Sequence, residues 1–92
     1  MTKQFQVVVM LNEGLADPQG KAIEDALPTL GFEGVSEVRV GKVIHLTMEG
    51  PTDEEIRRRV HEISERVLSN PVIESFWIVD VEEGSDVEVA AP

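Results

Sequence analysis

The sequence predicts an α+β domain with the order β-α-β-β-α-β: a ferredoxin-like sandwich, in which a four-stranded antiparallel sheet carries two helices on one face. Two observations support this prediction. Four segments have the apolar pattern of strands, and two segments have apolar residues at helical spacing behind N-capping residues. The domain is predicted over residues 1–81. An acidic tail over residues 82–92 has no sustained period and is expected to be disordered.

The first and last predicted strands, residues 5–12 and 72–81, are apolar on both faces. Two helices cover only one face of four strands, and each large apolar side chain left in water forgoes roughly 1.5–3 kcal/mol relative to burial. We therefore expect a homo-oligomer, either a dimer or a tetramer. The alternative is an ordinary strand-rich sheet with scattered outer apolar residues. The candidate oligomer-interface residues are Val8, Met10, Phe76 and Trp77.

The first helix is predicted to begin after Asp17, whose carboxylate can accept N–H bonds from the first turn, with Pro18 at the first helical position. Pro28 is predicted to truncate or bend it. Capping does not require Gln19 or Gly20, and glycine early in a helix costs about 1 kcal/mol against alanine. Either a neighbouring backbone approaches Gly20 closely, or the helix N-terminus receives a polar partner.

A hairpin is predicted between strands over residues 35–40 and 43–49. Gly41 and Lys42 stand between them, as in a type II′ turn, where glycine occupies the first position. Lys42 would then project at the hairpin tip beside Arg39. The two side chains would form a small cationic spot on an acidic protein.

The second helix begins with the capping box Thr52 and Glu55 and ends at Asn70-Pro71. On the helix face opposite the apolar stripe, four acidic residues each precede an arginine by four positions. The run Arg57–Arg59 therefore indicates a salt-bridged surface rather than a phosphate site. The apolar stripe comprises Ile56, Val60, Ile63, Val67 and Leu68.

Composition excludes several function classes. The formal net charge is -10, which would repel nucleic acid and anionic membrane surfaces. The chain has no cysteine and only two histidines, so a thiolate nucleophile is excluded and a conventional metal site is not expected. The longest apolar stretch is far shorter than a membrane span, and the N-terminal residues do not resemble a signal segment. A cytoplasmic location is expected.

No catalytic residues are expected in this chain. His45 occupies the strand phase opposite to its apolar neighbours, and His61 lies just beyond the stripe of the second helix. The serines show no nucleophile motif. Glu54-Glu55 is explained by capping, and Glu82-Glu83 belongs to the tail, so neither pair has the burial that general acid–base chemistry requires.

Three stretches together resemble, in order and spacing, signature stretches of the PurS family, the small subunit of phosphoribosylformylglycinamidine synthase. They are Asp17 to Ala22 (DPQGKA), Val38 to Lys42 (VRVGK) and Leu68 to Glu74 (LSNPVIE). The resemblance extends over about residues 5–81.

The resemblance implies a subunit of a glutamine-dependent ligase of purine biosynthesis, without catalytic residues of its own. It would bridge the large ATP-using synthetase subunit PurL and the glutaminase subunit PurQ, and would support ammonia transfer between them. ATP and magnesium would be used by PurL, and no cofactor is expected in this chain. The candidate partner-interface residues are Asp17, Pro18, Gln19, Gly20, Arg39, Gly41, Lys42, Asn70 and Pro71.

Two other functions fit the predicted fold. An ACT-like regulatory domain has the same element order and would bind an amino acid at a dimer interface. A compact dimeric enzyme would need a cleft with a perturbed histidine or carboxylate, and its turnover would depend on His45 or His61.

Overall fold

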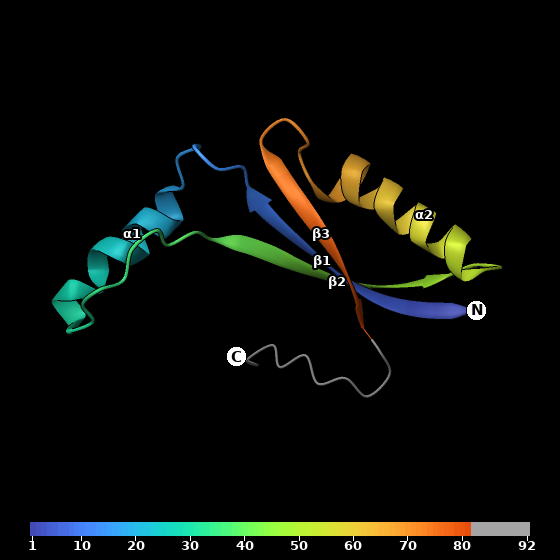
Figure 1. The fold of residues 1–92 in the computed structure, drawn as a ribbon, viewed down its shortest axis with the longest axis horizontal. Coiled ribbons are helices and arrows are strands. Elements are labelled where there is room, and N and C mark those ends of the chain that lie inside the picture. The colour runs from blue at the N-terminus through green and yellow to red at the C-terminus, as the bar shows by residue number, and fades with distance from the viewer. Residues whose placement is uncertain (82–92) are drawn as a thin grey trace.

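The computed structural model describes residues 1–81, in which three strands and two α-helices alternate (Figure 1). This confirms the α+β class with two helices. A 3-10 turn follows the first helix, and a π-helical turn extends the second. In chain order the elements are β1 (Thr2–Leu11), α1 (Pro18–Ala26), the 3-10 turn (Pro28–Leu30), β2 (Gly41–Glu49), α2 (Asp53–Ile63), the π-helical turn (Ser64–Leu68) and β3 (Glu74–Val81).

The sheet is antiparallel with the order β2-β1-β3, so β1 is the central strand. Helix α2 packs across one face and encloses the core between itself and β1. A ring of partly buried apolar side chains from β2, β3 and the π-helical turn surrounds this core. The fully buried apolar side chains are Phe5, Val7, Val9, Ile56 and Val60.

The fourth predicted strand, residues 35–40, does not form in the described part of the chain. The backbone N–H of Val38 donates to the carboxylate of Glu24 at 3.1 Å, and that of Val40 donates to Asp17 at 2.7 Å. Side chains of the α1 region therefore take the donors that a strand ladder would use. Glu37 also has a φ of 56°, which interrupts an extended conformation. The prediction of four strands is wrong for residues 1–81.

The hairpin turn predicted at Gly41-Lys42 is also wrong, because both residues belong to β2 and lie opposite Met10 and Val9 of β1. A Cβ atom at residue 41 would collide with the Met10 side chain and the Val9 carbonyl oxygen. The glycine therefore permits the close approach of two strands.

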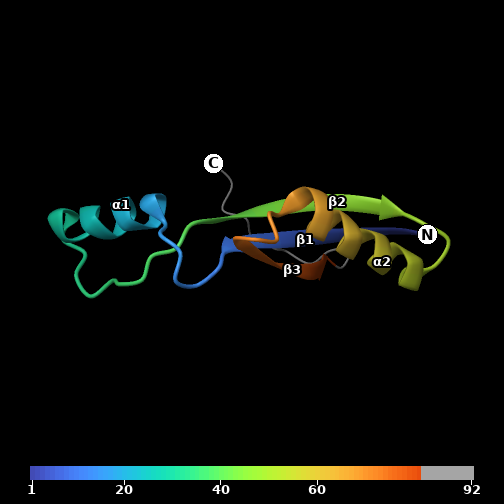
Figure 2. The ribbon, with the colours of Figure 1, turned by 90° about the horizontal axis from the view of Figure 1, so that it is seen from above.

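Helix α1 does not cover the sheet, contrary to the prediction of two helices on one face. It extends beyond one end of the strands, and the chain returns alongside it to β2 (Figures 1 and 2). We call this segment, residues 12–40, the arm. Because residues 35–40 do not form a strand, the connection through α1 is not a crossover between strands of the sheet, and α1 is not packed against the sheet. The helix ends at Ala26, before Pro28 as predicted, and Gly31 caps the following turn with a φ of 90°.

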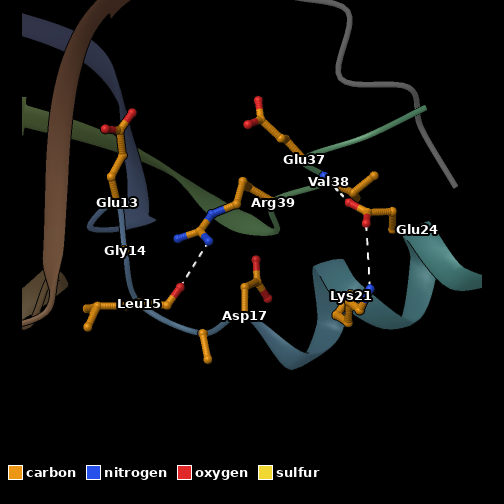
Figure 3. A pocket seen from close by; sticks show the side chains of 10 residues that line it. Glu13, Gly14, Leu15, Asp17, Lys21, Glu24, Glu37, Val38 and Arg39 are labelled. Carbon is orange, nitrogen blue, oxygen red and sulfur yellow. Dashed lines mark hydrogen bonds and ion pairs between the residues drawn. The ribbon is translucent and has the colours of Figure 1, made fainter. Parts of the chain in front are cut away.

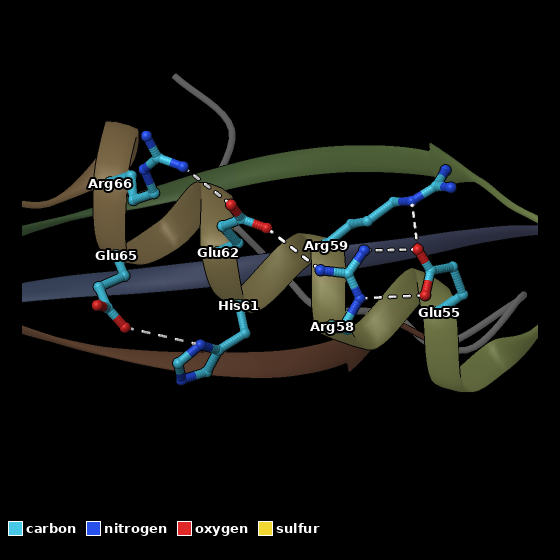
Figure 4. Close-up of polar contacts among 7 residues, drawn as sticks. All are labelled: Glu55, Arg58, Arg59, His61, Glu62, Glu65 and Arg66. Carbon is cyan, nitrogen blue, oxygen red and sulfur yellow. Dashed lines mark hydrogen bonds and ion pairs between the residues drawn. The ribbon is translucent and has the colours of Figure 1, made fainter.

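Helix α2 begins as predicted, since the Thr52 hydroxyl accepts a hydrogen bond from the Glu55 backbone N–H at 3.1 Å. Three of the four expected i,i+4 ion pairs form: Asp53–Arg57, Glu55–Arg59 and Glu62–Arg66. Arg58 instead lies between Glu55 and Glu62 (Figure 4). The run of three arginines is a salt-bridged surface, as expected.

Within the predicted apolar stripe of the second helix, Ile56 and Val60 are buried in the core, but Val67 is 75% exposed. The wider π-helical turn changes the angular spacing of side chains and moves Val67 away from the core. Ser64 is fully buried in this turn, where its hydroxyl donates to the Val60 carbonyl oxygen at 2.7 Å.

Candidate interaction surfaces

The sheet face opposite α2 is uncovered by any element within residues 1–81. We call it the outer face. Directly paired residues on neighbouring strands share a face, so the register identifies its members. Its largest exposed apolar side chains are Val43 (55%), Trp77 (54%) and Val79 (43%). The fourteen residues are Thr2, Gln4, Gln6, Val8, Met10, Gly41, Val43, His45, Thr47, Glu49, Ser75, Trp77, Val79 and Val81.

The structure places three of the four candidate oligomer-interface residues on the outer face. Val8 is half-buried between Val43 and Trp77, and Met10 lies at the end nearer the arm. Phe76 lies in the opposite phase of β3 and packs against the core. Its ring also meets the His61 ring edge-on, at 5.4 Å between centroids.

Sequence reasoning missed Val43 and Val79 as outer-face residues. The signal that could have identified them is the distribution of charge. In β2 the residues that alternate with the core-facing side chains are neutral until Glu49, and in β3 the corresponding phase has no charged residue. Recognising this signal requires the pairing of the strands as well as their sequences.

The arm carries a second group of uncovered apolar side chains. Four of them, from α1 and from the return segment, are between 45% and 68% exposed. The arm thus exposes its own apolar residues beyond the end of the sheet. These four are Ile23, Leu30, Phe32 and Val35.

The base of the arm is held by Asp17 and Arg39 (Figure 3). The Asp17 carboxylate accepts hydrogen bonds from the backbone N–H groups of Gly20, at 3.0 Å, and Val40. These two bonds hold the pKa of Asp17 below its usual value. The Arg39 guanidinium donates to the carbonyl oxygens of Leu15, at 3.0 Å, and of Asn12, at 3.2 Å.

Gly20 is buried, and a Cβ atom there would collide with the Val38 carbonyl oxygen. Close backbone approach therefore accounts for this glycine. Pro18 occupies the first turn of α1 as predicted, and the neighbouring Gln19 is exposed. The expected cationic spot is altered, because Arg39 is bound to carbonyl oxygens and Lys42 lies exposed within β2.

Asn70 organises the turn that leads into β3. Its side-chain oxygen accepts from the Val72 N–H at 3.1 Å, and its backbone N–H donates to the Glu74 carboxylate at 2.7 Å. Pro71 is exposed beside it. Local structure thus explains Asn70 and leaves Pro71 exposed.

A cavity of about 540 Å³ lies at the base of the arm. Charged side chains line it, but His45 and His61 do not. Lys21 pairs with Glu24 and Asp25, while Asp17 and Arg39 are engaged as described. In residues 1–81, no group of three or more His, Cys, Asp or Glu side chains is placed to hold a metal ion. Within the same range, no helix is long and apolar enough to cross a membrane.

The remaining predicted features can also be placed. His45 lies on the outer face, and His61 lies on α2 against Phe76. A compact enzyme was expected to have a cleft with a perturbed histidine or carboxylate. The cavity at the arm base has neither histidine in its lining, and its perturbed carboxylate, Asp17, is engaged in hydrogen bonds to backbone N–H groups. The tail predicted over residues 82–92 lies outside the described residues.

Comparison with known proteins gives a consistent result. The family model of PurS, phosphoribosylformylglycinamidine (FGAM) synthase, matches residues 4–83. The PurS subunit of phosphoribosylformylglycinamidine synthase from Methanocaldococcus jannaschii is 39% identical over 72 residues, which cover 78% of this chain and 87% of that protein. The corresponding Bacillus subtilis subunit is 39% identical over 73 residues, covering 79% and 86% of the two chains.

Solved structures agree with the sequence matches. A chain in the structure of PurLQS from Thermotoga maritima superimposes with a TM-score of 0.82 at 30% identity, covering 88% of this chain and 99% of that one. A PurS structure from B. subtilis gives a TM-score of 0.75 at 36% identity, covering 89% and 100%. The fold, the lengths and the sequence matches lead to one assignment: the chain belongs to the PurS family of phosphoribosylformylglycinamidine synthase.

Proposed function

We propose that this chain is a homo-oligomeric, non-catalytic subunit that bridges the PurL synthetase and PurQ glutaminase subunits of the synthase and supports the transfer of ammonia between them. The observation that carries the proposal is the match to a chain of PurLQS over nearly its whole length. The two uncovered apolar surfaces support it, because exposed apolar patches mark contacts with other molecules. ATP and magnesium belong, in this proposal, to PurL.

The candidate partner contacts can be ranked by what else each side chain does. Asp17, Gly20, Arg39 and Asn70 have structural tasks within the chain. Other candidates are exposed without such a task in the described structure, and we propose them as the direct contacts with PurL or PurQ. They are Gln19, Lys42 and Pro71.

Reconstitution from separately purified subunits tests the bridging role. Formation of the amidine product is measured with glutamine or with ammonium as the nitrogen source, with and without this chain. Glutamine-dependent turnover should require the chain, whereas ammonium-dependent turnover by the large subunit should need it much less. Equal glutamine-dependent turnover without the chain would contradict the proposal.

A matched pair of variants tests the contacts. Lys42→Glu reverses an exposed charge in the proposed contact set, and Lys21→Glu reverses an exposed charge on α1 outside that set. The first should weaken co-purification with the other subunits and lower glutamine-dependent turnover more than the second does. A larger effect of Lys21→Glu would refute this choice of contacts.

A further inference from the structure

The three sequence stretches that carry the family resemblance line one concavity. It is a cavity of about 330 Å³, which we call the notch. The first stretch contributes Asp17 to Gln19, the second contributes Val40 to Lys42, and the third contributes Glu74. Val9 and Leu11, the apolar residues of β1 that also line the notch, form its floor. Segments that are far apart in the sequence therefore meet at a single site.

The notch lies on the sheet face that carries α2, opposite to the outer face. Lys42 pairs with Val9 and Glu74 pairs with Leu11, and directly paired residues share a face. Val9 belongs to the core that α2 covers. Because the notch is also lined by the first residues of α1, it lies near the base of the arm.

The charged groups of the notch differ in what already binds them. The Asp17 carboxylate accepts two backbone N–H bonds, and the Glu74 carboxylate accepts one. Lys42 is exposed and forms no ion pair among residues 1–81. Gln19 is exposed as well. The notch therefore offers an ammonium group and a side-chain amide at its rim, above an apolar floor.

This composition suits a segment of another protein better than a small polar ligand. Protein–protein contacts combine an apolar centre with a polar rim. Within residues 1–81, every buried side-chain nitrogen or oxygen has a hydrogen-bond partner, so no buried polar group is left unpaired to orient a small ligand. The volume of the notch lies at the lower end of the roughly 300–1,000 Å³ of small-molecule pockets, which is room for one side chain and its adjoining backbone.

Charge and shape indicate which segment fits. A carboxylate beside Lys42 would accept a charge-assisted hydrogen bond from an ammonium group that has no partner in the described chain. A second copy of this chain fits poorly, because a two-fold contact would set one concavity against the other and Lys42 against Lys42. A different protein is therefore the better occupant.

We propose that the notch receives a segment of a partner subunit of the synthase, which places an apolar side chain on the floor and a carboxylate against Lys42. This inference rests on the bridging function proposed above and adds the site and the chemistry of the segment that fills it. Gln19 and Lys42 then act on one segment rather than as separate contacts. The bond from the Asn70 N–H to Glu74 ties the turn that carries Pro71 to the same site.

A double-mutant cycle tests whether the notch is one site. The chain is added to fixed amounts of PurL and PurQ, and the concentration that gives half-maximal glutamine-dependent turnover is measured. Gln19→Trp, which fills the notch, and Lys42→Gln should each raise this concentration about tenfold, and the double variant should also raise it about tenfold rather than a hundredfold. Effects that multiply, or no effect of Gln19→Trp, would overturn the proposal.

A matched control places the same bulk elsewhere on the arm. Thr29 is exposed in the 3-10 turn and does not line the notch. Thr29→Trp should change the half-saturating concentration less than about twofold, with far-UV circular dichroism confirming that both tryptophan variants are folded. An equal effect of Thr29→Trp and Gln19→Trp would show that bulk anywhere on the arm is harmful and would contradict the notch.

Salt dependence tests the carboxylate of the partner segment. The loss caused by Lys42→Gln should be about tenfold at roughly 0.05 M salt and should shrink to about threefold or less at roughly 0.5 M, because added ions screen the attraction between the two charges. A loss of the same size at both salt concentrations would refute the carboxylate.

Calorimetry of the isolated chain distinguishes the other class of occupant. Titration with glutamine should give no binding heat at millimolar concentrations. Binding that Gln19→Trp abolishes would assign the notch to an amino acid instead of a protein segment. A chain that is not required for glutamine-dependent turnover would refute the bridging function, whereas a required chain whose variants act independently would refute only the notch.

Discussion

Replacing Val60 with alanine should destabilise the protein strongly, whereas the same replacement at Val67 should have almost no effect. The two valines lie seven residues apart and belong to one stripe in a regular helix. In the structure Val60 is fully buried, and Val67 is 75% exposed after the π-helical turn. The pair therefore tests the helix geometry with identical chemistry at both sites.

The expected magnitudes follow from burial. Valine to alanine removes two methylene equivalents, worth about 1.6 kcal/mol when fully buried, and the cavity left behind adds about 1 kcal/mol more. Val60→Ala should thus cost about 2–3 kcal/mol and lower the melting temperature by roughly 10–20 °C for a domain of this size. At Val67 only about a quarter of the burial free energy of the two methyl groups is lost, and the higher helix propensity of alanine offsets this loss.

Urea unfolding followed by far-UV circular dichroism measures both variants at one protein concentration, because association shifts apparent stability. The difference between the two free energies of unfolding should be about 2 kcal/mol or more. Similar losses at both sites would show that the regular helical stripe continues through Val67, and the reasoning from the π-helical turn would be refuted.

Three further predictions concern the arm and the charged surface. Asp17→Asn should speed amide hydrogen exchange at Gly20 and Val40, because a neutral amide replaces the carboxylate that accepts both N–H bonds. The control Asp25→Asn, in α1, should leave exchange at these two amides unchanged. Equal exchange in the two variants would contradict the role of Asp17. Gly20→Ala should accelerate amide hydrogen exchange throughout α1 about fivefold, because overpacking against the Val38 carbonyl costs roughly 1–3 kcal/mol and the higher helix propensity of alanine offsets about 1 kcal/mol. Protection equal to that of the wild type would show that the Val38 carbonyl moves aside freely. Hydrogen bonds from Arg58 lower the pKa of Glu55 to about 2, and bonds from Arg57 lower the pKa values of Asp53 and Asp80, so the native state binds fewer protons than the unfolded chain. The contribution of these ion pairs to the free energy of unfolding should be complete above about pH 5 and disappear as the pH falls from about 4 to 2. The urea concentration at the midpoint of unfolding should fall over this range, and added salt should reduce the fall. A midpoint that stays constant from about pH 5 to 2 would rule this contribution out.

The local signals in the sequence were reliable where a residue acts on its own neighbours. Asp17 and Thr52 cap their helices, Pro28 follows the end of α1, and the apolar phase of β1 forms the core. The long-range pairing of residues 35–40 could not be predicted in the same way. Those residues have strand composition, but Asp17 and Glu24 compete for their backbone N–H groups, and this competition depends on where the arm folds back.

The candidate surfaces were only partly predictable for the same reason. The two-sided apolar pattern of β1 was visible in the sequence, and it correctly placed Val8 and Met10 away from α2. For β3 both phases are apolar, and only the pairing with β1 distinguishes Trp77 on the outer face from Phe76 in the core. Gly20 was recognised as unusual and Gly41 was assigned to a turn, and the atoms that lie close to each glycine are known only from the fold.

The distribution of apolar side chains supports the proposal that this chain packs against other molecules. Residues 1–81 have five fully buried large apolar side chains and twelve exposed ones. The exposed ones include five on the arm and three on the outer face. The bonds from Val38 to Glu24 and from Val40 to Asp17 join the return segment of the arm to its helix, and the arm so formed extends beyond the end of the sheet (Figure 1). In residues 1–81 the arm therefore leaves the outer face uncovered, and both surfaces are available for contacts with other molecules.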